Sequence, residues 1–140
     1  MIALASDHAG FELKEAIKKH LIKNNYDIQD YGTDSTASVD YPIYGKKAAE
    51  AVASGACDRG IVCCGSGIGI SIAANKVNGI RCALVHDEFG AEMCKRHNNA
   101  NMIAFGAKVV DAETAAKLVD IWMSTDFEGG RHQRRVEMID

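Results

Sequence analysis

Residues 61–69 read Ile-Val-Cys-Cys-Gly-Ser-Gly-Ile-Gly and join an apolar run to a glycine-rich turn. The run from Ile61 to Cys64 predicts a buried strand, because it is short, apolar and followed by glycines. A segment of helical character through Ala73 to Asn75 follows the turn. Strand, glycine turn and helix in this order form the repeating unit of a parallel α/β sheet, so we expect that fold class.

Outward from this segment, short apolar runs alternate with segments of helical period. The apolar runs predict further strands at residues 2–5, 26–31, 80–85 and 102–105. Helices are predicted at residues 11–23, 42–55, 88–96 and 112–124, with Pro42 in the first turn of one and Asp111 as the N-cap of the last. The pattern predicts one three-layer α/β/α domain over residues 1–140, built on a five-stranded parallel sheet.

The composition limits the classes of partner. The 140 residues carry a net charge of -3, whereas binding to nucleic acid or to an anionic membrane requires a basic face. No apolar run approaches the roughly 20 residues of a membrane span, and the first residues lack a charged targeting region. The 5 cysteines are odd in number, which indicates reduced thiols rather than a disulfide framework. We therefore expect a cytoplasmic protein with no nucleic-acid or membrane partner.

Ionisable residues follow several predicted strands, at the edge of a parallel sheet where ligands bind. In chain order they are Asp7 and His8, Cys64 with its loop, His86 with Asp87, and Lys108. The pattern predicts a site at this edge. Asp7 and His8 together suit proton transfer or anion binding, but Asp7 equally suits the N-cap of the helix that follows.

The glycine loop after Cys64 has two interpretations. Its backbone N–H groups and the helix start behind it suit a phosphate or an oxyanion that develops during a reaction, or the loop is only a tight turn. A Walker loop is excluded because no Gly-Lys-Ser/Thr follows. A thiol phosphatase is disfavoured because this sequence lacks the arginine that would close the cysteine loop. A dinucleotide fingerprint would place its third glycine one residue beyond Gly69, although Asp87 stands where a ribose-binding acid would. A nucleotide-binding module therefore stays as an alternative.

Cys64 ends a strand and begins this loop, a setting that favours a thiolate able to act as base or nucleophile. The alternative is a small buried side chain, which is the commoner fate of a strand cysteine. Strand alternation directs Cys63 and Cys64 to opposite faces of the sheet, so we expect at most one of them to be functional.

Two further features have both a functional and a structural interpretation. Cys94 and His97 are spaced i, i+3, but no second ligand pair completes a metal site, and none is predicted. Arg131 and Arg135 are spaced i, i+4, so on a helix they would project from one face and could clamp a phosphate. The alternative for these arginines is a solvated basic tail.

Taken together, five blocks of this sequence resemble the B-type ribose-5-phosphate isomerases and their relatives, which include galactose-6-phosphate isomerase. The resemblance extends nearly from end to end. It rests on residues 6–10 (Ser-Asp-His-Ala-Gly), 39–42 (Val-Asp-Tyr-Pro), 64–76 (Cys-Gly-Ser-Gly-Ile-Gly-Ile-Ser-Ile-Ala-Ala-Asn-Lys), 97–101 (His-Asn-Asn-Ala-Asn) and 128–132 (Glu-Gly-Gly-Arg-His).

The resemblance implies a Rossmann-like α/β/α fold and an aldose–ketose isomerisation through a cis-enediolate, without a metal or an organic cofactor. It implies that Cys64 is the base, that Ser66 moves protons between the two oxygens, and that His97 and Asp7 open the sugar ring. The substrate-binding residues it implies are His8, Arg131 and Arg135 for the phosphate, Asn98 for an oxygen, Tyr41 for the pocket wall, and Gly65, Gly67, Ile68 and Gly69 for the enediolate charge.

The resemblance also sets expectations for substrate and assembly. One branch of the family has a carboxylate base where this chain has Ile70, so this sequence resembles the cysteine branch. Lys108 stands where some members have an arginine. The lysine keeps the positive charge but cannot form the bidentate hydrogen bonds of a guanidinium group. A homodimer or homotetramer with sites shared between subunits is expected. Ribose 5-phosphate, in the pentose phosphate pathway, is the expected substrate, with a six-carbon substrate such as allose 6-phosphate or galactose 6-phosphate as the alternative.

Overall fold

The computed structural model describes residues 1–140. Strands and helices alternate along most of the chain. In order they are β1 (Ile2–Ser6), α1 (Phe11–Lys23), β2 (Ile28–Asp30), α2 (Tyr41–Ala53), β3 (Arg59–Cys64), α3 (Ile68–Asn75), β4 (Cys82–Leu84), α4 (Glu88–Arg96), β5 (Met102–Gly106), α5 (Ala112–Ser124) and α6 (Arg131–Ile139). No helix is long and apolar enough to cross a membrane.

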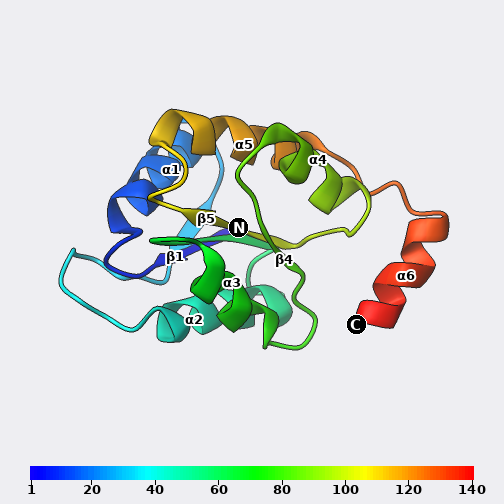
Figure 1. The fold of residues 1–140 in the computed structure, drawn as a ribbon, viewed down its shortest axis with the longest axis horizontal. Coiled ribbons are helices and arrows are strands. Elements are labelled where there is room, and N and C mark those ends of the chain that lie inside the picture. Colours follow the sequence, from blue (N-terminus) through cyan, green and yellow to red (C-terminus); the bar gives the residue numbers. More distant parts are fainter.

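The five strands form one parallel sheet in the order β2-β1-β3-β5-β4. Helices α1, α4 and α5 cover one face, and α2 and α3 cover the other (Figure 1). The predicted fold class, a three-layer α/β/α arrangement on a five-stranded parallel sheet, is confirmed. Helix α6 lies apart from these layers, beyond the end of the sheet opposite the 32–40 loop (Figure 1).

The predicted elements differ from the observed ones mainly at the sheet edges. The bounds of α1, α4 and α5 are as predicted, and Asp111 caps α5 by accepting a hydrogen bond from the Thr114 N–H at 2.8 Å. Strands β2 and β4 each have three residues, shorter than the apolar runs that predicted them. Both are edge strands and are paired on one side only, so less of each run is held in the ladder.

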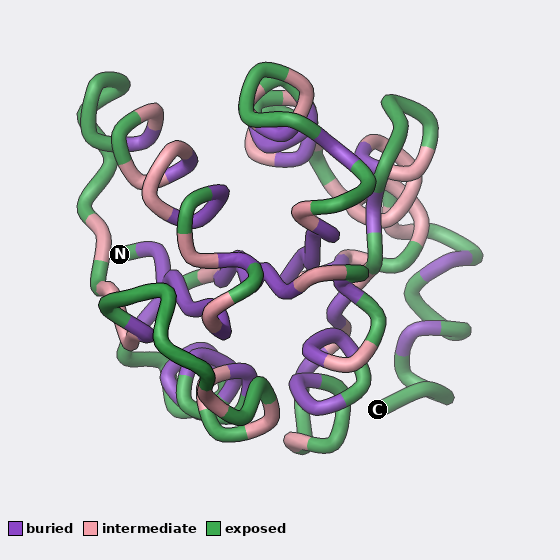
Figure 2. The backbone as a smooth tube through the Cα atoms, turned by 60° about the vertical axis from the view of Figure 1, so that its left-hand side comes forward, coloured by how far each residue is buried: buried purple, intermediate pink, exposed green.

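Two cores lie on the two faces of the sheet, and the central strands contribute alternate residues to each. The central strands are buried along most of their length (Figure 2). Ile61 and Cys63 point toward α1 and α5, whereas Val62 and Cys64 point toward α2 and α3. The predicted division of the two adjacent cysteines is therefore confirmed. Burial raises the pKa of the Cys63 thiol, so this cysteine is a protonated packing residue.

Lys14 is a buried charge that the helical pattern does not reveal. Its side chain is 1% exposed, and its Nζ donates to both carboxylate oxygens of Asp30, at 2.8 and 2.7 Å, and to the Thr33 carbonyl oxygen at 2.7 Å. Asp30 also accepts the Gly32 N–H at 2.8 Å. Lys14 thereby fixes the start of the loop that leads to the edge of the sheet where Cys64 ends its strand.

Asp30→Asn is expected to lower the free energy of unfolding by roughly 2–4 kcal/mol at neutral pH, because it leaves the Lys14 ammonium buried without its main counter-charge. Burial alone would raise the pKa of Asp30, but hydrogen bonds from Lys14, Gly32 and Lys18 outweigh it and lower the pKa. A lowered folded-state pKa stabilises the fold above the unfolded value of about 3.9, and that stabilisation is lost as pH falls through the folded value.

Urea unfolding of wild type and Asp30→Asn from pH 7 to pH 3 measures this difference. The gap between the two proteins should be largest at pH 7 and should begin to narrow as pH falls below about 4. Glu15→Gln is the matched control, since Glu15 lies 3.5 Å from the same Lys14 Nζ but has a more exposed side chain, at 36% against 20% for Asp30. A gap as large at pH 3 as at pH 7, or an equal effect of the control, would contradict this role of Asp30.

Candidate active site

Cys64 is the last residue of β3 and lies at the carboxyl edge of the sheet. It is buried at 5% exposure, and its Sγ accepts a hydrogen bond from the Gly67 N–H at 3.1 Å. The N–H of Ala107 holds the Cys64 carbonyl oxygen at 2.8 Å, which ties β3 to the turn after β5. A backbone donor directed at the sulfur stabilises negative charge there, as a thiolate base requires.

The glycine loop is held by close packing that only glycine allows. Gly67 has φ 78°, and a Cβ there would lie 2.8 Å from the backbone nitrogen of Gly106. Two loop N–H groups already have acceptors, since Gly67 donates to Cys64 and Ile68 donates to the Ser66 hydroxyl at 3.1 Å. The N–H groups left to hold an oxyanion are therefore those of Gly65, Ser66 and Gly69, a smaller set than the whole loop.

Asp7 and His8 follow β1 at the same edge. Asp7 is 6% exposed, and its Oδ1 accepts the Gly10 N–H at 2.9 Å, so the carboxylate holds the turn before α1. His8 Nδ1 accepts the Val39 N–H at 3.1 Å from the loop before α2. An accepting Nδ1 carries no proton, so the neutral ring has its N–H at Nε2, where it can donate to an anion.

Tyr41 and Lys108 complete the surroundings of the loop. The Tyr41 ring lies against Gly69, where a Cβ would come within 2.6 Å of the ring. The Lys108 N–H donates to the Gly65 carbonyl oxygen at 3.0 Å, and its Cε lies 4.0 Å from where a Gly65 Cβ would be. A cation and an aromatic ring thus lie beside the backbone next to Cys64.

The structure brings together Asp7, His8, Tyr41, Cys64 and Lys108, but it does not bring His97, Asn98, Arg131 and Arg135 to them within one chain. Gly60 pairs with Met102 at the amino ends of β3 and β5, and Cys64 pairs with Gly106 at their carboxyl ends. Four residue steps of a strand span about 13 Å. The C-terminal end of α4, which His97 caps, lies toward the amino ends of the strands, as does α6 (Figure 1).

This second group is built from the end of α4 and from α6. Arg131 and Arg135 are one turn apart on α6 and exposed, as the helical interpretation of their spacing predicted. The rings of His97 and His132 are stacked, with centroids 4.1 Å apart and planes at 9°. Glu128 lies 3.8 Å from Nε2 of His97 and 3.6 Å from Nε2 of His132.

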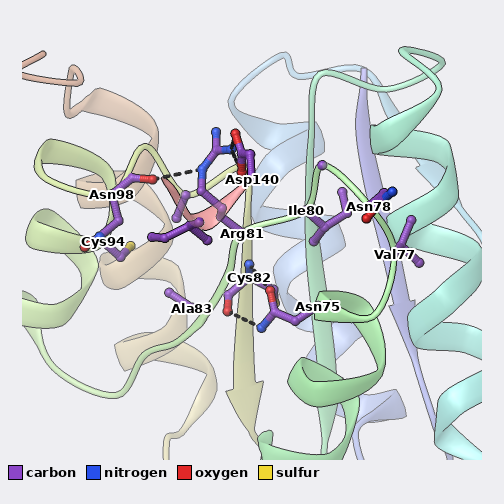
Figure 3. Close-up of a pocket in the computed structure, with 13 residues that line it drawn as sticks. Asn75, Val77, Asn78, Ile80, Arg81, Cys82, Ala83, Cys94, Asn98 and Asp140 are labelled. Carbon is purple, nitrogen blue, oxygen red and sulfur yellow. Dashed lines mark hydrogen bonds and ion pairs between the residues drawn. The ribbon is translucent and has the colours of Figure 1, made fainter. Parts of the chain in front are cut away.

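The largest cavity, about 460 Å³, also lies at this amino end rather than at the glycine loop (Figure 3). Arg81 crosses it, donating from Nε to the Asn98 carbonyl oxygen at 3.0 Å and from Nη1 to both carboxylate oxygens of Asp140 at 2.7 and 2.8 Å (Figure 3). Through these hydrogen bonds Arg81 holds the C-terminal end of α6 next to Asn98. Arg81 is not among the site residues predicted from the sequence, because nothing in its local pattern marks it.

Two alternative sites lose their support. Asp87 accepts the Gly90 N–H at 2.7 Å and caps α4, so the acid that a dinucleotide site would need serves the helix instead. The Cys94 thiol donates to the Ala91 carbonyl oxygen at 3.4 Å, and burial raises its pKa to about 11. The group of potential ligand atoms around His97 does not include the Cys94 sulfur, so the i, i+3 pair gains no support as a metal site.

Known proteins resemble this chain over almost its whole length. The model of the family described as Ribose/Galactose Isomerase matches residues 2–139. Ribose-5-phosphate isomerase B of Escherichia coli (strain K12) is 47% identical over 138 residues, which cover 99% of this chain and 93% of that protein.

Solved structures agree with this match. Ribose-5-phosphate isomerase B of Clostridium thermocellum superposes with a TM-score of 0.98 at 51% identity, covering 99% of this chain and 93% of that one. The enzyme of Mycoplasma genitalium, solved with bound ribulose-5-phosphate, gives a TM-score of 0.94 at 39% identity over 99% and 92% of the two chains. This chain belongs to the ribose/galactose isomerase family.

Proposed function

We propose that this protein is an aldose–ketose isomerase that interconverts ribose 5-phosphate and ribulose 5-phosphate. The single observation that carries the proposal is the setting of Cys64, whose buried sulfur accepts a backbone hydrogen bond beside a loop with unused N–H groups. A base next to an oxyanion site is what proton abstraction beside a carbonyl needs. The relatives named ribose-5-phosphate isomerase B support this substrate.

In the reaction, the Cys64 thiolate removes the C2 proton of the open-chain aldehyde. The C2–H electrons form a C1–C2 double bond, and the carbonyl electrons move to O1, which gives a cis-enediolate. The N–H groups of Gly65, Ser66 and Gly69 hold the negative oxygen. The Ser66 hydroxyl, which is exposed at the start of the loop, transfers a proton between O2 and O1. The thiol then returns its proton to C1, and O2 becomes the ketone.

The rest of the substrate requires residues from both ends of the sheet. His97 and Asp7 open the furanose ring, and Asn98 holds a sugar oxygen. Arg131, Arg135 and His8 bind the phosphate, His8 through its Nε2–H. Lys108 adds a cation beside the glycine loop as a point charge rather than a bidentate fork.

A homo-oligomer joins the two groups into one site. Within a chain they lie about 13 Å or more apart, whereas in the two-fold dimer proposed here the amino end of one chain lies against the carboxyl edge of the other. Ile68, Ile72 and Leu84 are exposed at 52%, 55% and 38% beside the glycine loop, and a second copy would cover them. A homodimer, or a homotetramer made of two such dimers, would then hold sites shared between subunits.

We place the enzyme in the cytoplasm and its reaction in the pentose phosphate pathway. The five cysteines are all free, and four of them are buried, which suits a reducing compartment. The interconversion of the two pentose phosphates is the step of that pathway that such an enzyme would carry out.

The activity is tested by following ribulose 5-phosphate formation from ribose 5-phosphate in the presence of a chelator. The expected result is full activity with chelator and a kcat/KM for ribose 5-phosphate well above that for allose 6-phosphate or galactose 6-phosphate. A preference for a six-carbon substrate would replace the pentose assignment. No turnover of any aldose phosphate, with measurable NAD or FMN binding, would replace the isomerase by a nucleotide-binding module.

A further inference from the structure

Three potential metal ligands converge at the junction of α4 and α6. They are the imidazoles of His97 and His132 and the carboxylate of Glu128, and their ligand atoms all lie within 4.8 Å of one another. Glu128 and His132 are spaced i, i+4, whereas His97 comes from a distant part of the chain. The cluster therefore forms only in the folded chain, and the spacing of its residues in the sequence does not predict it.

His132 provides a second, independent observation. Its side chain is 9% exposed, and its Nε2 is buried without a hydrogen-bond partner. Glu128 Oε1 lies 3.6 Å from this nitrogen, which is beyond hydrogen-bond range. Leaving a buried polar atom unpaired is costly, and Nε2 faces the same carboxylate as His97. A cation bound between these groups would satisfy that nitrogen.

The distances suit a tetrahedral ion after a modest movement. Bonds of about 2.0–2.1 Å to nitrogen and oxygen place tetrahedral ligands about 3.3 Å apart, compared with 3.6 and 3.8 Å between Glu128 and the two rings. The lone pairs of two parallel rings do not converge, so one ring must turn out of the stack. His97 is that ring, because its side chain is 38% exposed whereas His132 is enclosed.

Two imidazoles and one carboxylate are the ligand set typical of zinc sites that keep a fourth position open. Glu128 supplies one negative charge, and the adjacent Arg96 and Arg131 oppose a cation, so the site should be reversible rather than permanent. The Cys94 sulfur lies outside this group of ligand atoms.

We propose that His97, Glu128 and His132 form a binding site for a divalent transition metal of the Zn²⁺ class. The ion is no cofactor of the isomerisation. Binding withdraws Nε2 of His97 from the substrate, so the metal inhibits the enzyme. The inhibition rests on the ring-opening role of His97 proposed above, whereas the binding does not.

Binding is measured by calorimetry with Zn²⁺ and by absorption spectroscopy with Co²⁺ on the full chain carrying Cys64→Ser, which removes the thiol of the proposed base as a competing ligand. Glu128→Gln and His132→Gln are each expected to weaken binding by more than about tenfold. His86→Gln is the matched control, because His86 also lies beside a carboxylate, Asp87 Oδ2 at 3.7 Å, but its side chain is 61% exposed and lacks a third ligand. The control should bind like its parent.

The Co²⁺ spectrum should show the visible bands of a tetrahedral ion without a thiolate charge-transfer band. Unchanged affinity in Glu128→Gln, which replaces an exposed side chain and should fold normally, would overturn the site. A thiolate band, or an equal loss in the His86 control, would do the same. In the enzyme that keeps Cys64, Zn²⁺ should inhibit the Glu128→Gln variant less than the wild type. Binding of Zn²⁺ without inhibition would support the metal site but would overturn the proposal that the metal inhibits by withdrawing His97 from the substrate.

Discussion

Cys64→Ala is expected to lower kcat for ribose 5-phosphate by about 10²–10⁴-fold, the range for loss of a general base, while KM changes little. The sulfur is the one side-chain group at this edge that is buried and accepts an N–H from the loop, so no neighbour replaces it. Steady-state kinetics measures both constants. Cys64→Ser should be nearly as inactive, because a hydroxyl in the same place is a far weaker acid than a thiol.

Cys63→Ala is the matched control for this prediction. Cys63 is the neighbouring strand residue and equally buried, but it points into the core beneath α1 and α5. Its removal should cost some stability and leave kcat within about threefold of wild type. Activity of Cys64→Ala close to wild type, in a protein whose melting curve is unchanged, would contradict the assignment of the base.

A complex of two inactive chains is expected to regain activity. One chain carries Cys64→Ala and the other His97→Ala, each with its own affinity tag, and both tags are used to isolate the mixed species. If each site takes Cys64 from one chain and His97 from the other, one of the two sites in a mixed dimer is intact. The mixed complex should show about half the wild-type kcat per dimer, whereas each variant alone should lose at least about 10²-fold.

The control is a mixed complex in which both chains carry Cys64→Ala and only the tags differ, and it should stay inactive. An inactive mixed complex of the two different variants would contradict the shared site. So would a fully active chain that sediments as a monomer, because it would need no residue from a second copy.

The sequence predicted the layers well because their signals are local. The helical period of residues 11–23, the capping residue Asp111 and the apolar run before Gly65 each depend on neighbours a few positions away. The same holds for the division of Cys63 and Cys64 between two faces, which follows from strand alternation alone. The strand order, with β3 at the centre, depends on long-range pairing and was not predictable in this way.

The parts of the site that could not be predicted depend on tertiary contacts. A lysine in an amphipathic helix normally faces solvent, and Lys14 is buried only because Asp30 and Thr33 come to it from another element. The separation of His97 from Cys64 follows from which end of each element carries them, not from residue type. Likewise, the stack of His97 on His132 requires α6 to pack beside the end of α4.

The central claim, that Cys64 moves a proton between carbons through an enediolate, is tested most directly by isomerising ribulose 5-phosphate in D₂O. Proton NMR of the ribose 5-phosphate formed should show deuterium at C2, because a thiol exchanges its proton with solvent between abstraction and return. Under the same conditions Cys64→Ala should incorporate deuterium at least about 10²-fold more slowly. Deuterium incorporation by Cys64→Ala at the wild-type rate would contradict the mechanism.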